Sequence, residues 1–153
     1  DEKKDLKPLI EAQKLFSLVI TEYPNTDFAT DSQFKLNLIN DILASKEIYI
    51  ARLYQDKEKW IPAINRYKIV IDKYSETVYV EEAIHRLVEI YFKIGLVDES
   101  KRYAKLLGYN HQSSEWYKQT YKIFNKNYKP KNKRNSNKSK NNFVIQKFKN
   151  LFR

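Results

Sequence analysis

The apolar residues between positions 47 and 75 follow two helical patterns separated by a short polar break. In each half, apolar or small residues recur in steps of three and four, the spacing of a helix with one buried stripe. The first half contains Ile50, Ala51 and Tyr54, and the second contains Ala63, Tyr67, Val70, Ile71 and Tyr74. The break spans residues 55–60, and Pro62 then suits a first helical turn because its missing N–H has no partner there. This pattern predicts two antiparallel helices whose backbones approach closely at Ala51 and Ala63.

The same pattern recurs on both sides, which makes the helix pair one unit of a series. An offset of 51 residues, from Ala12 to Ala63, relates the pair to Ala12, Phe16, Val19, Ile20, Tyr23 and Thr26. An offset of 37 residues, from Ala63 to Ser100, relates it to Leu87, Val88, Tyr91, Ser100, Ala104 and Leu107. The second offset is close to the roughly 34 residues of a tetratricopeptide repeat. We therefore predict an all-α, tetratricopeptide-like solenoid of stacked antiparallel helix pairs, and an unrelated bundle with accidental similarity is the alternative.

One helix of this series is expected to be unusually long. From about Phe28 to Gln55 the chain has no glycine or proline, and apolar residues continue at helical spacing. A continuous helix of this length would reach roughly 40 Å. A break near residues 44–46, giving two stacked helices, is the alternative.

Residues that favour helix ends mark the other boundaries. Pro8 can open the first helix, Thr26 or Asp27 can cap the long one, and Thr77 can cap the next. The two glycines, Gly95 and Gly108, are each followed by an apolar residue and are expected to end helices. Ser113 or Ser114 is expected to cap a last helix over about residues 115–125, which closes the stack.

The net charge of +10 lies entirely at one end of the chain. Residues 1–124 contain 19 Lys or Arg and 19 Asp or Glu, whereas residues 125–153 contain 10 Lys or Arg and no acid. A neutral repeat body gives no reason to expect nucleic-acid binding there. We predict two parts, a repeat domain over residues 1–128 and a basic tail over residues 129–153.

Candidate chemistry is sparse. The chain has no cysteine and only two histidines, and it shows no phosphate-binding loop and no metal-ligand spacing. We therefore expect no enzymatic activity, no cofactor and no metal. The chain also lacks methionine, even at position 1, and we expect it to be a piece of a longer protein with any signal sequence upstream.

The basic tail has two interpretations. Residues 126–142 are nearly all Lys, Asn and Ser, a composition that cannot bury enough surface to order itself. The last eleven residues read FVIQKFKNLFR, in which basic and apolar residues alternate at helical spacing. The tail is either a disordered solubilising end or a contact to an anionic membrane surface. The residues expected to make that contact are Lys147, Phe148, Lys149, Leu151 and Phe152.

Three stretches resemble one known family. They read AINRYKIVIDKY (63–74), VEEAIHRLVEIYFKIGLVDES (80–100) and LGYNHQSSEWYKQTYKIF (107–124). Together with the long preceding helix, they resemble the BamD lipoproteins of the bacterial outer-membrane β-barrel assembly machinery, in particular the alphaproteobacterial members and their C-terminal repeats. One departure is Ser75, where a proline commonly closes the repeat. The tail after Lys129 lies outside the resemblance.

The resemblance implies a non-enzymatic scaffold on the periplasmic face of the outer membrane, held by a lipid on an upstream cysteine. It implies binding to the periplasmic domains of the barrel-forming subunit BamA and to other lipoproteins of the machinery. It also implies contact with unfolded outer-membrane protein segments and help with their insertion, and it implies no nucleic-acid partner. The rival interpretations are a generic peptide-binding tetratricopeptide adaptor or co-chaperone, and a nucleic-acid binder acting through the tail.

The first helix of each tetratricopeptide pair lines a concave groove that can hold a partner. Carrying that geometry over places Ile48, Arg52, Gln55, His85, Glu89 and Phe92 on the groove. We expect Arg52, Arg66 and Phe92 to contribute to binding a protein partner, with the two arginines able to pair with carboxylates through two hydrogen bonds. An ordinary solvated face is the alternative for any one of these residues. For His85 that alternative is a surface ion pair with a neighbouring glutamate.

Overall fold

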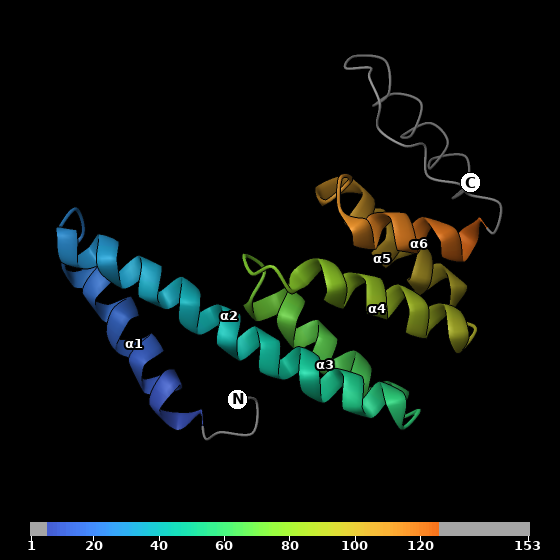
Figure 1. The fold of residues 1–153 in the computed structure, drawn as a ribbon, viewed down its shortest axis with the longest axis horizontal. Coiled ribbons are helices and arrows are strands. Elements are labelled where there is room, and N and C mark those ends of the chain that lie inside the picture. Colours follow the sequence, from blue (N-terminus) through green and yellow to red (C-terminus); the bar gives the residue numbers. More distant parts are fainter. Residues whose placement is uncertain (1–5, 126–153) are drawn as a thin grey trace, which may run out of the picture.

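The computed structural model describes residues 6–125, and every regular element in that range is an α-helix. The helices are α1 (Lys7–Glu22), α2 (Asp27–Asp56), α3 (Trp60–Lys73), α4 (Val80–Lys93), α5 (Val97–Asn110) and α6 (Glu115–Phe124). They form an elongated row of antiparallel neighbours, with α1 at one end and α6 at the other (Figure 1). The predicted all-α, tetratricopeptide-like fold is confirmed. The predicted domain boundary at residue 128 lies outside the described residues and stays a prediction.

The long helix is continuous. Helix α2 has 30 residues with no break at residues 44–46, and it begins at the predicted cap, where Thr26 accepts a hydrogen bond from the N–H of Ala29. Its first half packs against α1 and its second half against α3 (Figure 1). One helix therefore packs against both of its neighbours in the row and holds these two parts of the row together.

The core between α2, α3 and α4 depends on the predicted small residues. Ala51 and Ala63 are both fully buried, which allows the two helices to approach closely. The largest side chain in this core is that of Tyr67, which is also fully buried and donates a hydrogen bond of 2.8 Å to Oε1 of Gln55. Burial raises the pKa of the Tyr67 hydroxyl, and this hydroxyl remains a donor inside the core.

A second core lies between α4, α5 and α6. It contains Val80, Ile84, Val88, Ala104, Leu107, Tyr117 and Tyr121. Ser100, the residue that the 37-residue offset relates to Ala63, is completely buried here and donates a hydrogen bond of 2.9 Å to the carbonyl of Val88. A small hydroxyl fits where the neighbouring helix passes closely because a backbone carbonyl satisfies it.

Most helix ends lie where the sequence predicted them, and two predictions about helix ends are wrong. Ser114 caps α6 as predicted, accepting from the N–H of Tyr117. Thr77 does not cap α4, which begins at Val80; its hydroxyl instead donates to the carbonyl of Tyr74 at 2.7 Å and closes the turn after α3. Gly108 does not end a helix either, because a glycine costs only about 1 kcal/mol inside a helix and α5 continues to Asn110.

Gly95 ends α4 through a Schellman motif, as the sequence predicted. Its φ is +84°, its N–H donates to the carbonyl of Phe92, and the N–H of Leu96 donates to the carbonyl of Tyr91. The turn after α2 has the same two bonds, from Glu58 to Gln55 and from Lys59 to Tyr54. The repeat therefore extends from the helices to the backbone of their connecting turns.

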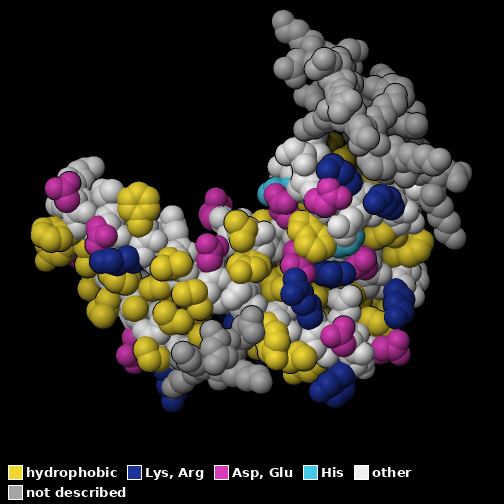
Figure 2. Space-filling model, in the orientation of Figure 1, with side chains coloured by type: hydrophobic (Ala, Val, Ile, Leu, Met, Phe, Trp, Pro, Cys, Tyr) yellow, Lys and Arg dark blue, Asp and Glu magenta, His cyan; other side chains and the backbone are white. Residues whose placement is uncertain are grey.

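The N-terminal end of the row exposes apolar side chains. Helix α1 has no buried residue, and the exposed apolar side chains of α1 and the first half of α2 are Ile10, Leu15, Leu18, Phe28, Phe34, Leu38 and Ile42. Figure 2 shows hydrophobic side chains gathered over these two helices, whereas basic and acidic side chains intermingle over the other end. Among residues 6–125, no helix is both long enough and apolar enough to cross a membrane.

Candidate protein-binding face

The first helices of successive pairs, α2, α4 and α6, carry a connected set of charged and aromatic side chains. Helix α4 lies at the centre, since it packs against α3, α5 and α6. The outline of the molecule is hollowed between the first half of α2 and the part formed by α4, α5 and α6 (Figure 2). The side chains of α2, α4 and α6 are the candidate contacts for a partner.

Arg52 on α2 is joined to Glu82 on α4. Its guanidinium donates to both carboxylate oxygens, with Nε to Oε1 at 2.9 Å and Nη2 to Oε2 at 2.6 Å. The Arg52 side chain is 52% exposed, whereas that of Glu82 is 7% exposed. The bidentate pairing that the sequence predicted with a partner's carboxylate is thus made within the chain, and one edge of Arg52 still faces solvent.

Arg86 extends this network along α4. Its Nη1 donates to Oε2 of Glu89 at 2.7 Å, and its Nε lies 3.6 Å from Oε1 of Glu82. Its guanidinium also stacks over the ring of Trp116 on α6, 5.4 Å from the ring centre. Arg86 therefore connects two carboxylates of α4 with the terminal helix.

Glu89 is the partly buried acid of this network. Burial works against its charge, but hydrogen bonds from His85 and Arg86 outweigh that effect and hold the pKa of the Glu89 carboxyl below its usual value. The carboxylate is therefore stabilised in its charged form. The sequence predicted Glu89 on the groove, which stays a prediction, and the structure leaves its side chain 34% exposed.

His85 is not a groove residue. It is only 1% exposed, with Nδ1 hydrogen-bonded to Oγ1 of Thr120 at 2.7 Å and Nε2 lying 3.4 Å from Oε1 of Glu89. Its ring also lies 5.2 Å from that of Trp116. The expectation of a groove-lining or surface histidine is wrong because α6 covers this face of α4. His85 is a polar core residue that fixes α6 on α4.

Ile48 is also placed in the interior. It is 2% exposed and belongs to the core cluster with Ala44, Ala51 and Tyr67. The expected groove position is wrong because this part of α2 turns the face of Ile48 toward α3. Gln55, about two turns further along, is partly buried and is held by the hydroxyl of Tyr67.

Arg66 and Phe92 lie apart from each other. Arg66 on α3 donates to Oε2 of Glu47 on α2 at 3.0 Å, with its side chain 38% exposed. Phe92 on α4 is 42% exposed and packs edge-to-face on Phe124 of α6, with ring centres 5.5 Å apart. The structure thus gives the two predicted arginines different partners, Glu82 on α4 for Arg52 and Glu47 on α2 for Arg66.

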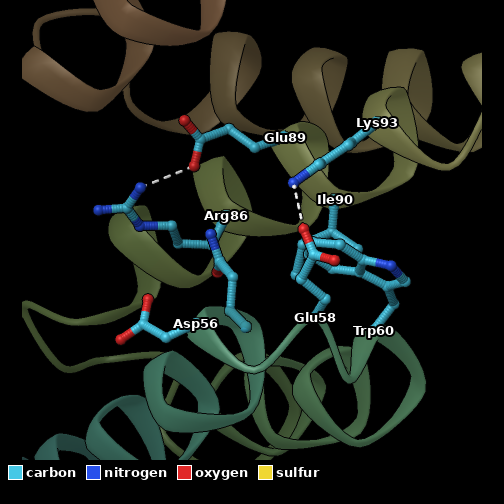
Figure 3. A pocket seen from close by; sticks show the side chains of 8 residues that line it. Asp56, Glu58, Trp60, Arg86, Glu89, Ile90 and Lys93 are labelled. Atoms are coloured by element: carbon cyan, nitrogen blue, oxygen red, sulfur yellow. Dashed lines mark hydrogen bonds and ion pairs between the residues drawn. The ribbon is translucent and has the colours of Figure 1, made fainter.

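A cavity of about 390 Å³ opens between the turn after α2 and helix α4. The end of α2 contributes Gln55 and Asp56, the turn contributes Glu58, the start of α3 contributes Trp60, and α4 contributes Arg86, Glu89, Ile90 and Lys93. Figure 3 shows Lys93 reaching down from α4 to Glu58, at 3.4 Å, beside the ring of Trp60. Asp56, Glu58, Trp60 and Lys93 were not predicted from the sequence, although a tryptophan within a polar turn was a signal for them.

Two further expectations concern a membrane contact in the basic tail and the absence of a metal site. Lys147, Phe148, Lys149, Leu151 and Phe152 lie outside the described residues, so the contact to an anionic surface stays a prediction. Within residues 6–125, no three His, Asp or Glu side chains lie close enough together to hold a metal ion.

Stacked antiparallel helix pairs with a polar face along their first helices define a tetratricopeptide-like repeat protein of the all-α class. Comparison with known proteins is more specific, because residues 1–107 match the YfiO family, described as an outer membrane lipoprotein. The chain therefore belongs to the YfiO family of outer membrane lipoproteins, and the resemblance seen in the sequence is confirmed.

Individual relatives agree with this assignment. The chain is 49% identical over 113 residues to outer membrane protein assembly factor BamD of Rickettsia prowazekii, covering 74% of this chain and 45% of the relative. It is 43% identical over 109 residues to the protein of the same name from Caulobacter vibrioides, covering 71% of this chain and 36% of the relative. The chain thus spans less than half the length of these relatives.

Proposed function

We propose that this chain is part of a non-enzymatic scaffold subunit of the outer-membrane β-barrel assembly machinery. In this proposal it binds the periplasmic domains of BamA and other lipoproteins of the machinery, and it aids the insertion of outer-membrane proteins. The observation that carries the proposal is the family match over residues 1–107, joined to relatives named as outer membrane protein assembly factors. That match includes helices α1 to α4 and most of α5, and so two of the three helices, α2 and α4, that carry the polar face.

The geometry supports docking more than chemistry. Arg52 and Arg66 are each held by a carboxylate of the same chain, yet their side chains remain 52% and 38% exposed. An arginine already fixed on a rigid helix loses little conformational freedom when a partner's carboxylate joins it, so less binding free energy is lost on ordering. Phe92, 42% exposed and backed by Phe124, offers a separate apolar anchor on α4.

The proposed location follows from the same family. We place the chain at the periplasmic face of the outer membrane, with a lipid anchor supplied by a cysteine upstream of residue 1. Unfolded segments of outer-membrane proteins are a further proposed ligand.

A capture experiment tests the proposal. The chain is immobilised, and the purified periplasmic domains of BamA from the same organism are passed over it, with an unrelated tetratricopeptide protein as the matched control. Saturable retention on the chain and none on the control is the expected result. If a correctly folded chain retains no more than the control, the scaffold role proposed for these residues is wrong.

A further inference from the structure

The cavity between the turn after α2 and helix α4 has an apolar floor and a charged rim. Trp60 and the buried Ile90 form the floor, whereas the rim carries the carboxylates of Asp56, Glu58 and Glu89. Figure 3 shows Lys93 above Glu58 and Trp60 on one side of this space, with Asp56 on the other side, below Arg86. An aromatic ring beside carboxylates is an arrangement that attracts a cation.

The charged groups around this cavity differ in how many ion-pair partners they have. Arg86 is engaged by Glu89 at 2.7 Å, approaches Glu82 at 3.6 Å and stacks on the ring of Trp116. Within residues 6–125, Asp56 forms no ion pair, and Glu58 is paired only with Lys93. The rim therefore holds one carboxylate with no cation and one with a single exposed cation.

The position of Lys93 shows that a positively charged group fits over the Trp60 ring. Its ammonium lies 4.5 Å from the centre of the Trp60 ring, and the distance to Oε1 of Glu58 is 3.4 Å. Both members of this ion pair are largely exposed, 61% for Lys93 and 72% for Glu58. Exposed pairs of this kind contribute little free energy, so a competing cation can displace Lys93 at small cost.

We propose that this cavity is a subsite for one arginine or lysine side chain of a protein partner. The incoming cation takes the place of Lys93 over Trp60 and pairs with Glu58, the unpaired carboxylate of Asp56 adds negative charge to the same cavity, and Lys93 swings out to solvent. Lys93 is then an internal substitute that fills the subsite in the absence of a partner. The inference deepens the proposed function, on which it rests for the existence of a partner, by naming the side chain that such a partner presents.

A small-molecule probe tests the subsite without any partner. N-acetyl-arginine amide is titrated into the ¹⁵N-labelled chain of 153 residues, and the indole N–H signals of Trp60 and Trp116 are followed by NMR. The Trp60 signal is expected to shift saturably and by more than the Trp116 signal, because Trp116 does not line the cavity and contacts it only through Arg86. N-acetyl-citrulline amide has nearly the same shape without the charge and is expected to shift neither signal.

Two variants with opposite expected effects sharpen the test. Asp56→Asn is expected to weaken binding of the arginine probe about threefold, and Lys93→Met is expected to strengthen it about twofold to threefold by removing the internal competitor. Lys101→Met on α5 makes the same charge change outside the cavity and is expected to leave the affinity unchanged. Equal responses to the arginine and citrulline probes, or weaker binding after Lys93→Met, would overturn the subsite.

The two proposals fail separately. Loss of the probe effect together with intact capture of BamA domains would remove the subsite and leave the scaffold role. Probe binding without any capture would keep the subsite and remove BamA as the partner.

Discussion

Glu58 and Gly95 occupy the same position of the same turn, one after α2 and one after α4. Both have a positive φ, +55° for Glu58 and +84° for Gly95, and each lies in a turn closed by the same pair of backbone hydrogen bonds. Only glycine adopts this conformation without a steric penalty, because a Cβ atom crowds the following carbonyl. The turn after α2 therefore carries strain that its copy after α4 does not.

Gly95→Ala is expected to destabilise the chain by about 1 kcal/mol. A Cβ atom built at position 95 meets nothing within 4 Å, so the loss comes from the backbone alone and not from crowding. Urea unfolding followed by circular dichroism measures it as a lower midpoint with an unchanged slope. An unchanged midpoint would mean that the turn relaxes to accommodate alanine.

Glu58→Gly is expected to have the opposite effect, stabilising the chain by up to about 1 kcal/mol. The relief of strain outweighs the exposed ion pair with Lys93 that the substitution removes. Glu58→Ala is the matched control, since it removes the carboxylate and keeps the Cβ atom. Thermal unfolding of the three proteins should rank glycine highest, and equal melting temperatures for the glycine and alanine variants would rule out backbone strain as the cause.

Glu82→Ala is expected to cost about 1–3 kcal/mol, more than Arg52→Ala. The carboxylate is 7% exposed, so its loss leaves Arg52 without its acceptor and removes a nearby negative charge from Arg86, which keeps its hydrogen bond to Glu89. Arg52 is half exposed, and water can replace part of what it loses. A double-mutant cycle should return a coupling of about 0.5–1 kcal/mol between the two residues, and zero coupling would show that the contact contributes nothing measurable.

The stability of the chain is expected to fall in acid partly through Glu89. Its pKa is lower in the folded chain than the ordinary 4.5, because hydrogen bonds from His85 and Arg86 outweigh its burial. The charged form therefore stabilises the fold above about pH 4.5, and this contribution is lost as the pH falls below that value through the folded pKa.

Glu89→Gln removes the titrating group and keeps the shape of the side chain. The difference in urea midpoint between wild type and Glu89→Gln should be largest near neutral pH and should shrink below pH 4.5. A difference that stays constant between about pH 3 and pH 7 would show that the charge of Glu89 does not stabilise the fold.

Features set by neighbours in sequence were the ones that could be predicted. The repeat of small and apolar residues indicated the helix pairs, the absence of glycine and proline indicated the continuous α2, and single capping side chains indicated Thr26 and Ser114. Each of these depends on residues within one or two helical turns. Thr77 was mistaken for a cap because the choice between capping α4 and closing the turn after α3 depends on where α4 begins.

Features set by the crossing of distant helices were missed. Ile48 and His85 were assigned to a groove from an idealised repeat, but Ile48 is packed in the core between α2, α3 and α4, and α6 covers His85. The partners Arg52 and Glu82 are 30 residues apart, and His85 and Thr120 are 35 apart. No local pattern specifies such pairs, because they depend on the relative rotation of whole helices.

The affinity of the chain for the periplasmic domains of BamA tests the proposed scaffold role most directly, measured by biolayer interferometry for wild type and two charge variants. Arg66→Glu reverses the charge and breaks the contact with Glu47, whereas the double variant Arg66→Glu, Glu47→Arg restores that ion pair with its polarity exchanged. We predict saturable binding by the wild type, about tenfold weaker binding by both variants, and near-normal folding of the double variant. Wild-type affinity in the double variant would contradict the docking role of Arg66, and no binding by the folded wild type would contradict the scaffold role itself.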